Sequence, residues 1–266
     1  MKNTLFLKAA VAVAFVAVIA VNFLANALPI NGVTTGEASD TLGNLFAPAG
    51  VTFAIWGLIY VLLLGYTVYQ FGLIQKNKGA EHEKLFYKIN KYYFVTSLAN
   101  IAWIFAWHYG VIWLSLIFMI ILLVFLIKIA DVINKEKYDF KDTLFIRVPF
   151  SVYFGWITVA TIANVTAFLV SINWNGFGIP ETVWTIIVLL VGSGIGIART
   201  LKDKNIFYGL VLVWAYGGIW LKHTSPSGFE GAYPNIITTV ILCIVLFLGT
   251  IGYLGYKQFA SKRVEK

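Results

Sequence analysis

Long runs of apolar residues, separated by short polar segments, dominate the pattern of this chain. A helix needs about 20 predominantly apolar residues to cross the hydrocarbon core of a bilayer. The runs are too long and too continuous for barrel strands, which alternate apolar and polar positions over about 10 residues. The pattern therefore predicts an all-α integral membrane protein, an eight-helix transmembrane bundle. We expect the spans near residues 5–28, 50–74, 92–109, 111–133, 145–171, 181–199, 206–222 and 234–256.

The composition is also typical of a chain that lies in a bilayer. Hydrophobic residues make up 59% of the 266 residues and charged residues only 12%, about half the charged share of a soluble domain. The net charge of +8 does not indicate a nucleic-acid partner, because lysine and arginine gather in short segments between apolar runs and form no basic face. The single cysteine, Cys243, excludes an internal disulfide and a Cys/His metal site.

The basic residues predict the orientation of the spans. Nearly all of the Lys and Arg residues fall in or beside alternate connections, and such connections face the cytoplasm. Segments 29–49, 109–111, 172–180 and 223–233 contain no Lys or Arg and are expected outside. We therefore expect a multi-pass protein of the plasma membrane with both termini cytoplasmic. The expected inner segments are residues 75–91, 134–142, 199–204 and 256–266.

The first apolar run has a second interpretation. Lys2 and Lys8 before the run, and the small residues "ANA" at 25–27, resemble a cleavable secretory signal. The run from Ala9 to Ala27 exceeds the usual 7–15 residues of a signal core, so we expect the span to be retained. The outer segment between Pro29 and Gly50 is either a structured lid over the bundle or a solvated connector, and the sequence leaves both open.

Charged residues that could couple transport to ions, or perform hydrolysis, are scarce inside the expected spans. Those present lie near the cytoplasmic ends, where long side chains reach the interface, and no carboxylate lies near the middle, which disfavours a proton-driven pump. No Ser/His/Asp set, nucleotide loop or paired carboxylate is visible, so we do not expect an enzyme. His108, at an outer end, is interpreted as an interfacial residue, with a ligand contact as the alternative. The charged residues meant here are Lys128, Asp131, Arg147 and Arg199.

Aromatic and amide side chains recur at helical spacing in three of the spans. They line one face of each helix, and Trp156 lies too deep for an interfacial belt. The asparagines either join helices by hydrogen bonds or, with the rings, line a pocket for a flat hydrophobic ligand. The depth of Trp156 favours the pocket. The residues are Trp56 and Tyr60 in the second span, Asn100, Trp103 and Trp107 in the third, and Trp156, Ala160 and Asn164 in the fifth.

Two weaker patterns concern packing and lipid. The glycines of "GSGIG" at 192–196, and Gly249, Gly252 and Gly255, predict surfaces for close helix packing. The pattern of an apolar residue, tyrosine and a basic residue that has been suggested for sterol contact occurs in "LFYKINK" at 85–91.

At the aromatic stretches, the chain resembles the TspO/MBR family of tryptophan-rich sensory proteins and translocator proteins, a five-helix bundle. The family's W-x-x-x-Y, N-x-x-W and W-x-T-x-A-T-x-x-N patterns occur in order on the second, third and fifth spans, and the short link at 109–111 matches the family's tight hairpin. The resemblance covers residues 5–172. It implies domains at 1–172, a TspO-like five-helix core, and at 173–266, three additional helices and a basic tail.

The resemblance also implies an apolar cavity, closed by the first loop, that takes tetrapyrroles or other flat ligands. A porphyrin or haem-like ligand is thus compatible with the chain, and a homodimer remains open. The lining would be formed by Trp56, Tyr60, Asn100, Trp103, Trp156, Ala160 and Asn164, with Trp107 beside them.

The family's proline-rich loop signature is reduced here to Pro48, and Pro149 precedes Trp156 by seven residues instead of four. These departures weaken the inference of porphyrin specificity. We therefore expect a membrane receptor or sensor for a planar hydrophobic ligand. The alternative is a small-molecule transporter or permease that is not coupled to ions through charges at the middle of the membrane.

Overall fold

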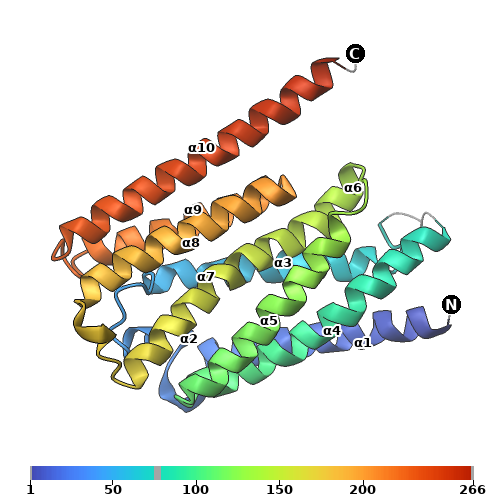
Figure 1. Cartoon of the computed structure of the whole chain (residues 1–266). Coiled ribbons are helices and arrows are strands. Elements are labelled where there is room, and N and C mark those ends of the chain that lie inside the picture. The colour runs from blue at the N-terminus through green and yellow to red at the C-terminus, as the bar shows by residue number, and fades with distance from the viewer. Residues whose placement is uncertain (1, 75–78, 265–266) are drawn as a thin grey trace. The chain divides into compact units, whose positions relative to one another are not determined.

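Each of the eight apolar runs forms a long helix in the computed structural model, which describes residues 2–74 and 79–264 (Figure 1). All regular elements in these residues are helices, and no strand occurs among them. The long helices are α1 (Lys2–Ala27), α3 (Ile55–Tyr69), α4 (Ala80–His108), α5 (Ile112–Ile133), α7 (Val148–Ser171), α8 (Glu181–Asp203), α9 (Ile206–Thr224) and α10 (Pro234–Val264). Short elements are η1 (Ile30–Gly32), α2 (Thr35–Asp40), η2 (Gly50–Ala54), α6 (Phe140–Asp142), η3 (Thr143–Arg147) and η4 (Gly176–Gly178).

Six helical runs within the described ranges are long and apolar enough to cross a membrane: Thr4–Ala27, Gly50–Tyr69, Ile112–Ile133, Phe140–Ser171, Glu181–Asp203 and Pro234–Ala260. The helices α4 and α9 are not among them. Polar and aromatic residues recur along the whole of α4, and α9 ends in "KHT", which lowers their mean hydropathy. The prediction of an all-α membrane protein is confirmed. The orientation and the type of membrane stay predictions, and residues 75–78 and 265–266 of two expected inner segments lie outside the described residues.

The tight hairpin expected at residues 109–111 is confirmed. Helix α4 ends at His108 and α5 begins at Ile112. Gly110 adopts a φ of +70°, a conformation that costs glycine little because it has no Cβ. The backbone N–H of Val111 donates to the carbonyl of Ala106 at 2.9 Å. These three connecting residues therefore leave α4 and α5 antiparallel and packed along one another.

The helix of the fifth span begins earlier than the pattern predicts, and it contains a π-helical turn. The turn η3 follows α6 directly, and the N–H of Val148 donates to the carbonyl of Thr143, five residues back. Pro149 comes next in the sequence and has no N–H to donate. Extra-residue turns of this kind occur where the regular hydrogen-bond ladder is interrupted. The proline thus marks the place where the helix changes its winding.

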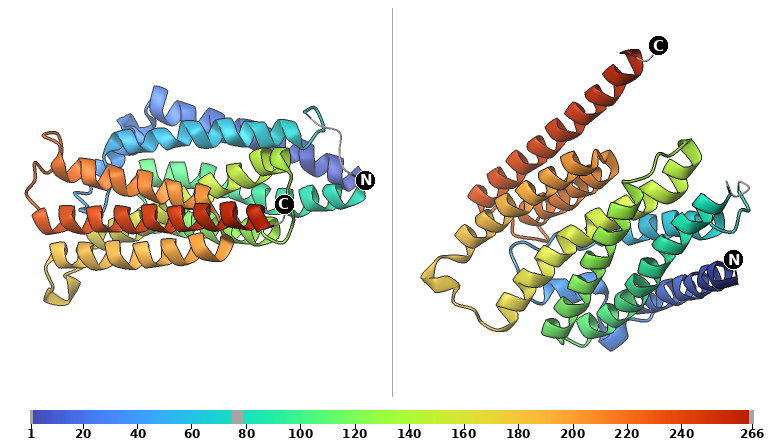
Figure 2. Two further views of the ribbon diagram at one scale, coloured as in Figure 1. Left: turned by 90° about the horizontal axis from the view of Figure 1, so that it is seen from above. Right: turned by 45° about the vertical axis from the view of Figure 1, so that its right-hand side comes forward.

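The chain divides into two compact units, and the helices of each can be followed in Figure 2. The first unit comprises Met1–Ala38 and Ala54–Ile157; within it, α4 packs against both α1 and α5. The second comprises Ser39–Phe53 and Thr158–Lys266; within it, α10 packs against both α8 and α9. The domain boundary expected at residue 172 stays a prediction.

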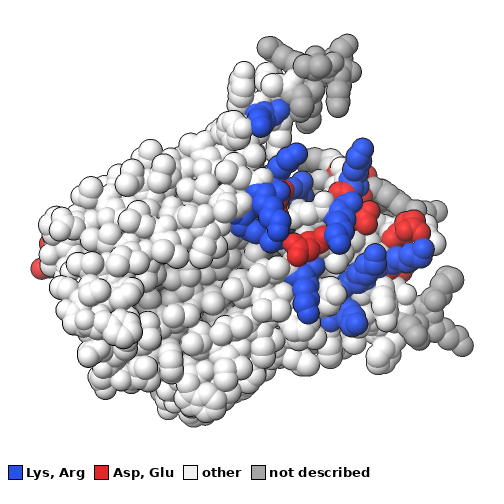
Figure 3. Space-filling model, in the orientation of Figure 1, with Lys and Arg blue, Asp and Glu red and all other residues white. Residues whose placement is uncertain are grey.

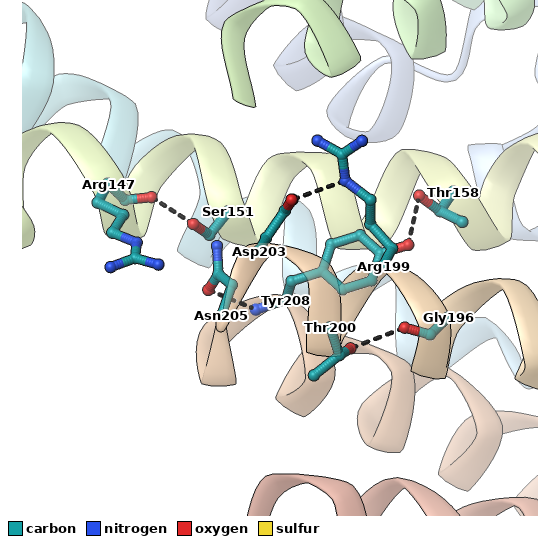
Figure 4. A network of polar contacts seen from close by, with 9 residues as sticks. All are labelled: Arg147, Ser151, Thr158, Gly196, Arg199, Thr200, Asp203, Asn205 and Tyr208. Carbon is teal, nitrogen blue, oxygen red and sulfur yellow. Dashed lines mark hydrogen bonds and ion pairs between the residues drawn. The ribbon is translucent and has the colours of Figure 1, made fainter. Parts of the chain in front are cut away.

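Charged side chains recur near the starts of α1 and α4 in the first unit and near the end of α8 in the second. Figure 3 shows in blue and red the charged residues on one face. In the first unit, the Lys8 ammonium lies 2.8 Å from a carboxylate oxygen of Glu83. In the second, Arg199 Nε donates to Asp203 at 2.6 Å, and both side chains are largely buried (Figure 4). Arg199 therefore bonds to its own helix one turn on, where the sequence predicted a side chain that reaches for the interface.

The two glycine surfaces predicted from the sequence differ in how closely they pack against other helices. In the second unit, a Cβ added at Gly192 would lie 2.9 Å from the Tyr216 hydroxyl and 3.0 Å from Ile162 Cδ1. This tight fit confirms the close packing that was predicted for 192–196. A Cβ on any of the three glycines of α10, Gly249, Gly252 and Gly255, would meet no atom within 4 Å. That stripe does not pack closely against another part of the described chain.

Candidate functional site

The indole of Trp56 is the centre of an aromatic cluster in the first unit. One turn of α3 places Trp56 and Tyr60 on one face, and their rings stack with centroids 5.6 Å apart. The Trp56 ring also meets Trp103 of α4 at 6.2 Å and Trp156 of α7 at 6.3 Å. At these separations, the rings contact one another directly. Residues from three helices, separated by up to 100 positions in the sequence, thus form one cluster.

Most of the predicted site residues join this cluster. Trp107 stacks on Trp103 with centroids 5.9 Å apart, and Asn100 lies one turn before Trp103, fully buried. Ala160 and Asn164 lie on the part of α7 that belongs to the second unit. Their assignment to the site therefore rests on the sequence.

Sequence reasoning missed two residues beside the cluster. Tyr153 meets the Trp56 ring at 5.9 Å, edge to face, and Asn22 of α1 donates to Asn100 Oδ1 at 2.8 Å. The signal for Tyr153 was its position one turn before Trp156 on the same helix face. The signal for Asn22 was an amide inside an apolar run, which needs a partner there.

The rings of Trp56, Tyr60 and Trp103 each carry a hydrogen-bond donor that is buried without an acceptor in the described structure. These donors are the indole nitrogens of Trp56 and Trp103 and the hydroxyl of Tyr60. A buried donor without an acceptor costs about 1–3 kcal/mol, and such groups are few in folded proteins. Tyr60 and Trp103 both contact the Trp56 ring, so these three donors mark a place where an acceptor from outside the chain would be stabilised.

His108 holds the loop after α1 against the end of α4. Its side chain is only 2% exposed; one ring nitrogen lies 3.0 Å from the Thr35 hydroxyl and the other 3.1 Å from the carbonyl of Ile30. The Asn31 amide donates to the His108 carbonyl at 2.9 Å. Both ring nitrogens thus bond to the loop, so His108 is buried within the protein, and its depth in a membrane stays a prediction.

Trp107 adds a further contact to this loop, since its indole nitrogen donates to the carbonyl of Thr35 at 3.3 Å. A few residues on, backbone and side-chain hydrogen bonds from Thr34 hold the pKa of the Glu37 carboxyl below its usual range. Of the two interpretations of this segment, a structured loop agrees with these contacts and a solvated connector does not.

The rest of the loop is equally well held, within the second unit. The Lys222 ammonium lies 2.8 Å from a carboxylate oxygen of Asp40, and His223 bonds to the carbonyl of Leu45 at 2.9 Å. The backbone N–H of Ala49 donates to the carbonyl of Gly218 at 3.0 Å. These contacts tie three separate points of residues 39–53 to α9.

A polar cluster at the opposite end of the first unit was also missed. The buried carboxylate of Asp142 accepts the hydroxyl of Tyr69 at 2.7 Å and lies 3.1 Å from His82 Nε2. The three residues come from the ends of α3, α4 and α6, so no sequence spacing relates them. The cluster joins three helix ends where the connecting segments are polar.

The comparisons with known proteins bear on these features. Neither the curated proteins nor the solved structures include a match to this chain. A family model described as TSPO-like protein matches residues 8–253. The resemblance inferred from the sequence rested on residues 5–172, whereas this match also takes in α8, α9 and most of α10. Because the match spans nearly the whole chain and the structure is an all-α membrane fold, the chain belongs to the TSPO-like protein family.

Proposed function

We propose that this protein is a membrane receptor or sensor that binds a planar hydrophobic ligand at the cluster around Trp56. The observation that carries the proposal is the set of three buried donors without acceptors, on Trp56, Tyr60 and Trp103. Ring faces stack on a flat ligand, while indole and phenol donors orient it through acceptor atoms at its edge. A tetrapyrrole with carboxylate groups has both properties.

The cluster must open to admit such a ligand. A flat ring between two others needs about 7 Å from face to face, since carbon atoms in contact lie roughly 3.5 Å apart. The rings around Trp56 have centroids 5.6–6.3 Å from its own. We therefore expect the ligand to replace a ring–ring contact, and binding to be accompanied by a change in tryptophan fluorescence.

The test uses the full-length protein purified in detergent micelles, with protoporphyrin IX as the probe. Trp103→Phe and Trp56→Phe each keep an apolar ring and remove one unpaired donor. We expect either change to weaken binding about tenfold, the effect of one hydrogen bond to a charged acceptor. The matched control is Trp113→Phe on α5, whose ring is 57% exposed. Unchanged binding in both cluster variants, with a retained helical circular dichroism spectrum, would contradict the proposal.

Two further readouts separate a receptor from a transporter and from an enzyme. A receptor gives no movement of porphyrin into proteoliposomes above that of empty vesicles, and it returns the porphyrin chemically unchanged. Flux that Trp103→Phe abolishes would establish a transporter instead. A change in the mass of the recovered pigment would establish an enzyme.

A further inference from the structure

A pocket lies at the end of the first unit where α1 and α4 begin. Its volume is about 1060 Å³, at the upper limit of the range of small-molecule sites. The walls come from the first residues of α1, from Phe71 after α3, and from Gly79 and the first turns of α4. The side chains that matter here are Leu5, Lys8, Phe71, Lys84, Tyr87 and Lys88.

The pocket carries an excess of positive charge. Lys8 is buried, with its ammonium 2.8 Å from Glu83 and 5.1 Å from the centre of the Phe86 ring. Lys84 and Lys88 are exposed and one turn apart, so they project from the same face of α4. Lys84 also pairs with Glu81 at the surface, an exposed contact that is worth little. An anion at the rim would meet two ammonium groups that can move to it.

Apolar side chains lie open beside these lysines. Leu5 is 62% exposed, Tyr87 44% and Phe71 38%. Together with the lysines, they make a surface that is apolar on one side and cationic on the other, as at a membrane interface. A water-soluble anion would use only the lysines. A ligand with a phosphate and hydrocarbon chains would use both parts.

We propose that this pocket is a binding site for one anionic phospholipid. The phosphate lies on Lys84 and Lys88, and the acyl chains run along Leu5 and Phe71. The distribution of basic residues predicts that this end of the unit faces the cytoplasm, the side on which anionic lipids attract basic segments. The "LFYKINK" stretch, whose pattern has been suggested for sterol contact, thus supplies Tyr87 and Lys88 to a phospholipid site.

This site is independent of the ligand proposed for the aromatic cluster. Lys88 and Trp103 lie on the same helix, 15 residues and therefore about 22 Å apart along its axis. Trp103→Phe should leave lipid binding unchanged, and changes at Lys84 and Lys88 should leave porphyrin binding unchanged. Failure of one proposal can thus be distinguished from failure of the other.

Native mass spectrometry of the full-length, detergent-purified protein tests the proposal. The probes are palmitoyl-oleoyl phosphatidylglycerol and the matched phosphatidylcholine, added at equal concentrations. We expect one phosphatidylglycerol to remain bound in preference to phosphatidylcholine. The double variant Lys84→Gln, Lys88→Gln should lower this affinity at least tenfold, since each lysine near an anionic headgroup contributes several-fold. The control, Lys135→Gln with Lys137→Gln, removes the same charge from the exposed segment after α5 and should change nothing.

Four outcomes would overturn the proposal. Equal affinity for the two lipids would show that the headgroup charge does not contribute to binding. An equal loss of phosphatidylglycerol affinity in both double variants would show that the effect depends only on the net charge of the protein. Displacement of the lipid by millimolar inorganic phosphate, or preferential binding of cholesterol, would assign the pocket to a soluble anion or to a sterol. A further variant, Leu5→Ser, should weaken lipid binding by its loss of chain contact while the preference for the anionic headgroup remains.

Discussion

Asn22 of α1 and Asn100 of α4 share a hydrogen bond of 2.8 Å between two buried side chains. The Asn22 amide also donates to the carbonyl of Val18 in its own helix. An amide inside an apolar run is stable only when such partners exist. This bond shows that Asn100 joins two helices, in addition to any role in the aromatic cluster.

Replacement of Asn22 tests how much that bond contributes. Asn22→Ala leaves Asn100 Oδ1 without its donor, and we expect the free energy of unfolding to fall by about 1 kcal/mol, as for other bonds between membrane helices. The measurement is thermal unfolding in detergent, with Asn134→Ala at an exposed position after α5 as control. Equal midpoints for the two variants would argue against a stabilising bond.

His108 offers a test of the loop. His108→Ala removes both ring contacts, to Thr35 and to Ile30, and the loop loses about 1–2 kcal/mol of local stability. Amide hydrogen exchange in residues 30–36 should rise about tenfold. The neighbouring Tyr109→Phe, at a side chain that is 61% exposed, should leave it unchanged. Exchange as slow in His108→Ala as in the parent protein would show that other contacts hold the loop.

Substitution by alanine should have opposite effects on stability at two adjacent glycines of α9. At Gly218, a Cβ would lie 2.6 Å from Thr52 Cγ2 and 2.8 Å from Thr52 Cβ, whereas at Gly217 it would meet nothing within 4 Å. Thr52 is buried, so Gly218→Ala should destabilise the protein by about 1–3 kcal/mol. Gly217→Ala should be neutral or stabilising by up to about 1 kcal/mol, because alanine favours the helix. Thermal unfolding midpoints in the reverse order would refute the close approach of Thr52 to α9.

Tyr69 donates a hydrogen bond to the buried carboxylate of Asp142, so a substitution at Tyr69 should lower the stability of the protein. Tyr69→Phe keeps the ring but removes the hydroxyl that donates to Asp142 at 2.7 Å. A hydrogen bond to a charged group contributes about 1.5–3 kcal/mol, and we expect that loss in chemical unfolding. A second reporter is limited proteolysis of residues 134–141, which should become faster. Stability equal to that of the parent protein would indicate that the other contacts of Asp142 satisfy the carboxylate.

The features that the sequence determined are those that depend on one helix at a time. Apolar runs long enough for a bilayer predict membrane helices, because an unpaired backbone polar group is too costly in hydrocarbon for any open alternative. The hairpin at residues 109–111 follows from the small number of connecting residues. The one-face arrangement of Trp56 with Tyr60, and of Asn100 with Trp103, follows from the 3.6-residue helical period.

Only the tertiary structure decided which faces meet. Tyr69, His82 and Asp142 have no common spacing, and the bond between Asn22 and Asn100 joins positions 78 residues apart. His108 has the sequence context of an interfacial residue, yet it is buried because the loop folds onto it. Hydrophobicity in the membrane directs a helix into the bilayer but does not choose its neighbours, since lipid tails are as apolar as leucine. That choice rests on close packing and on a few polar pairs, which exist only once the helices have assembled.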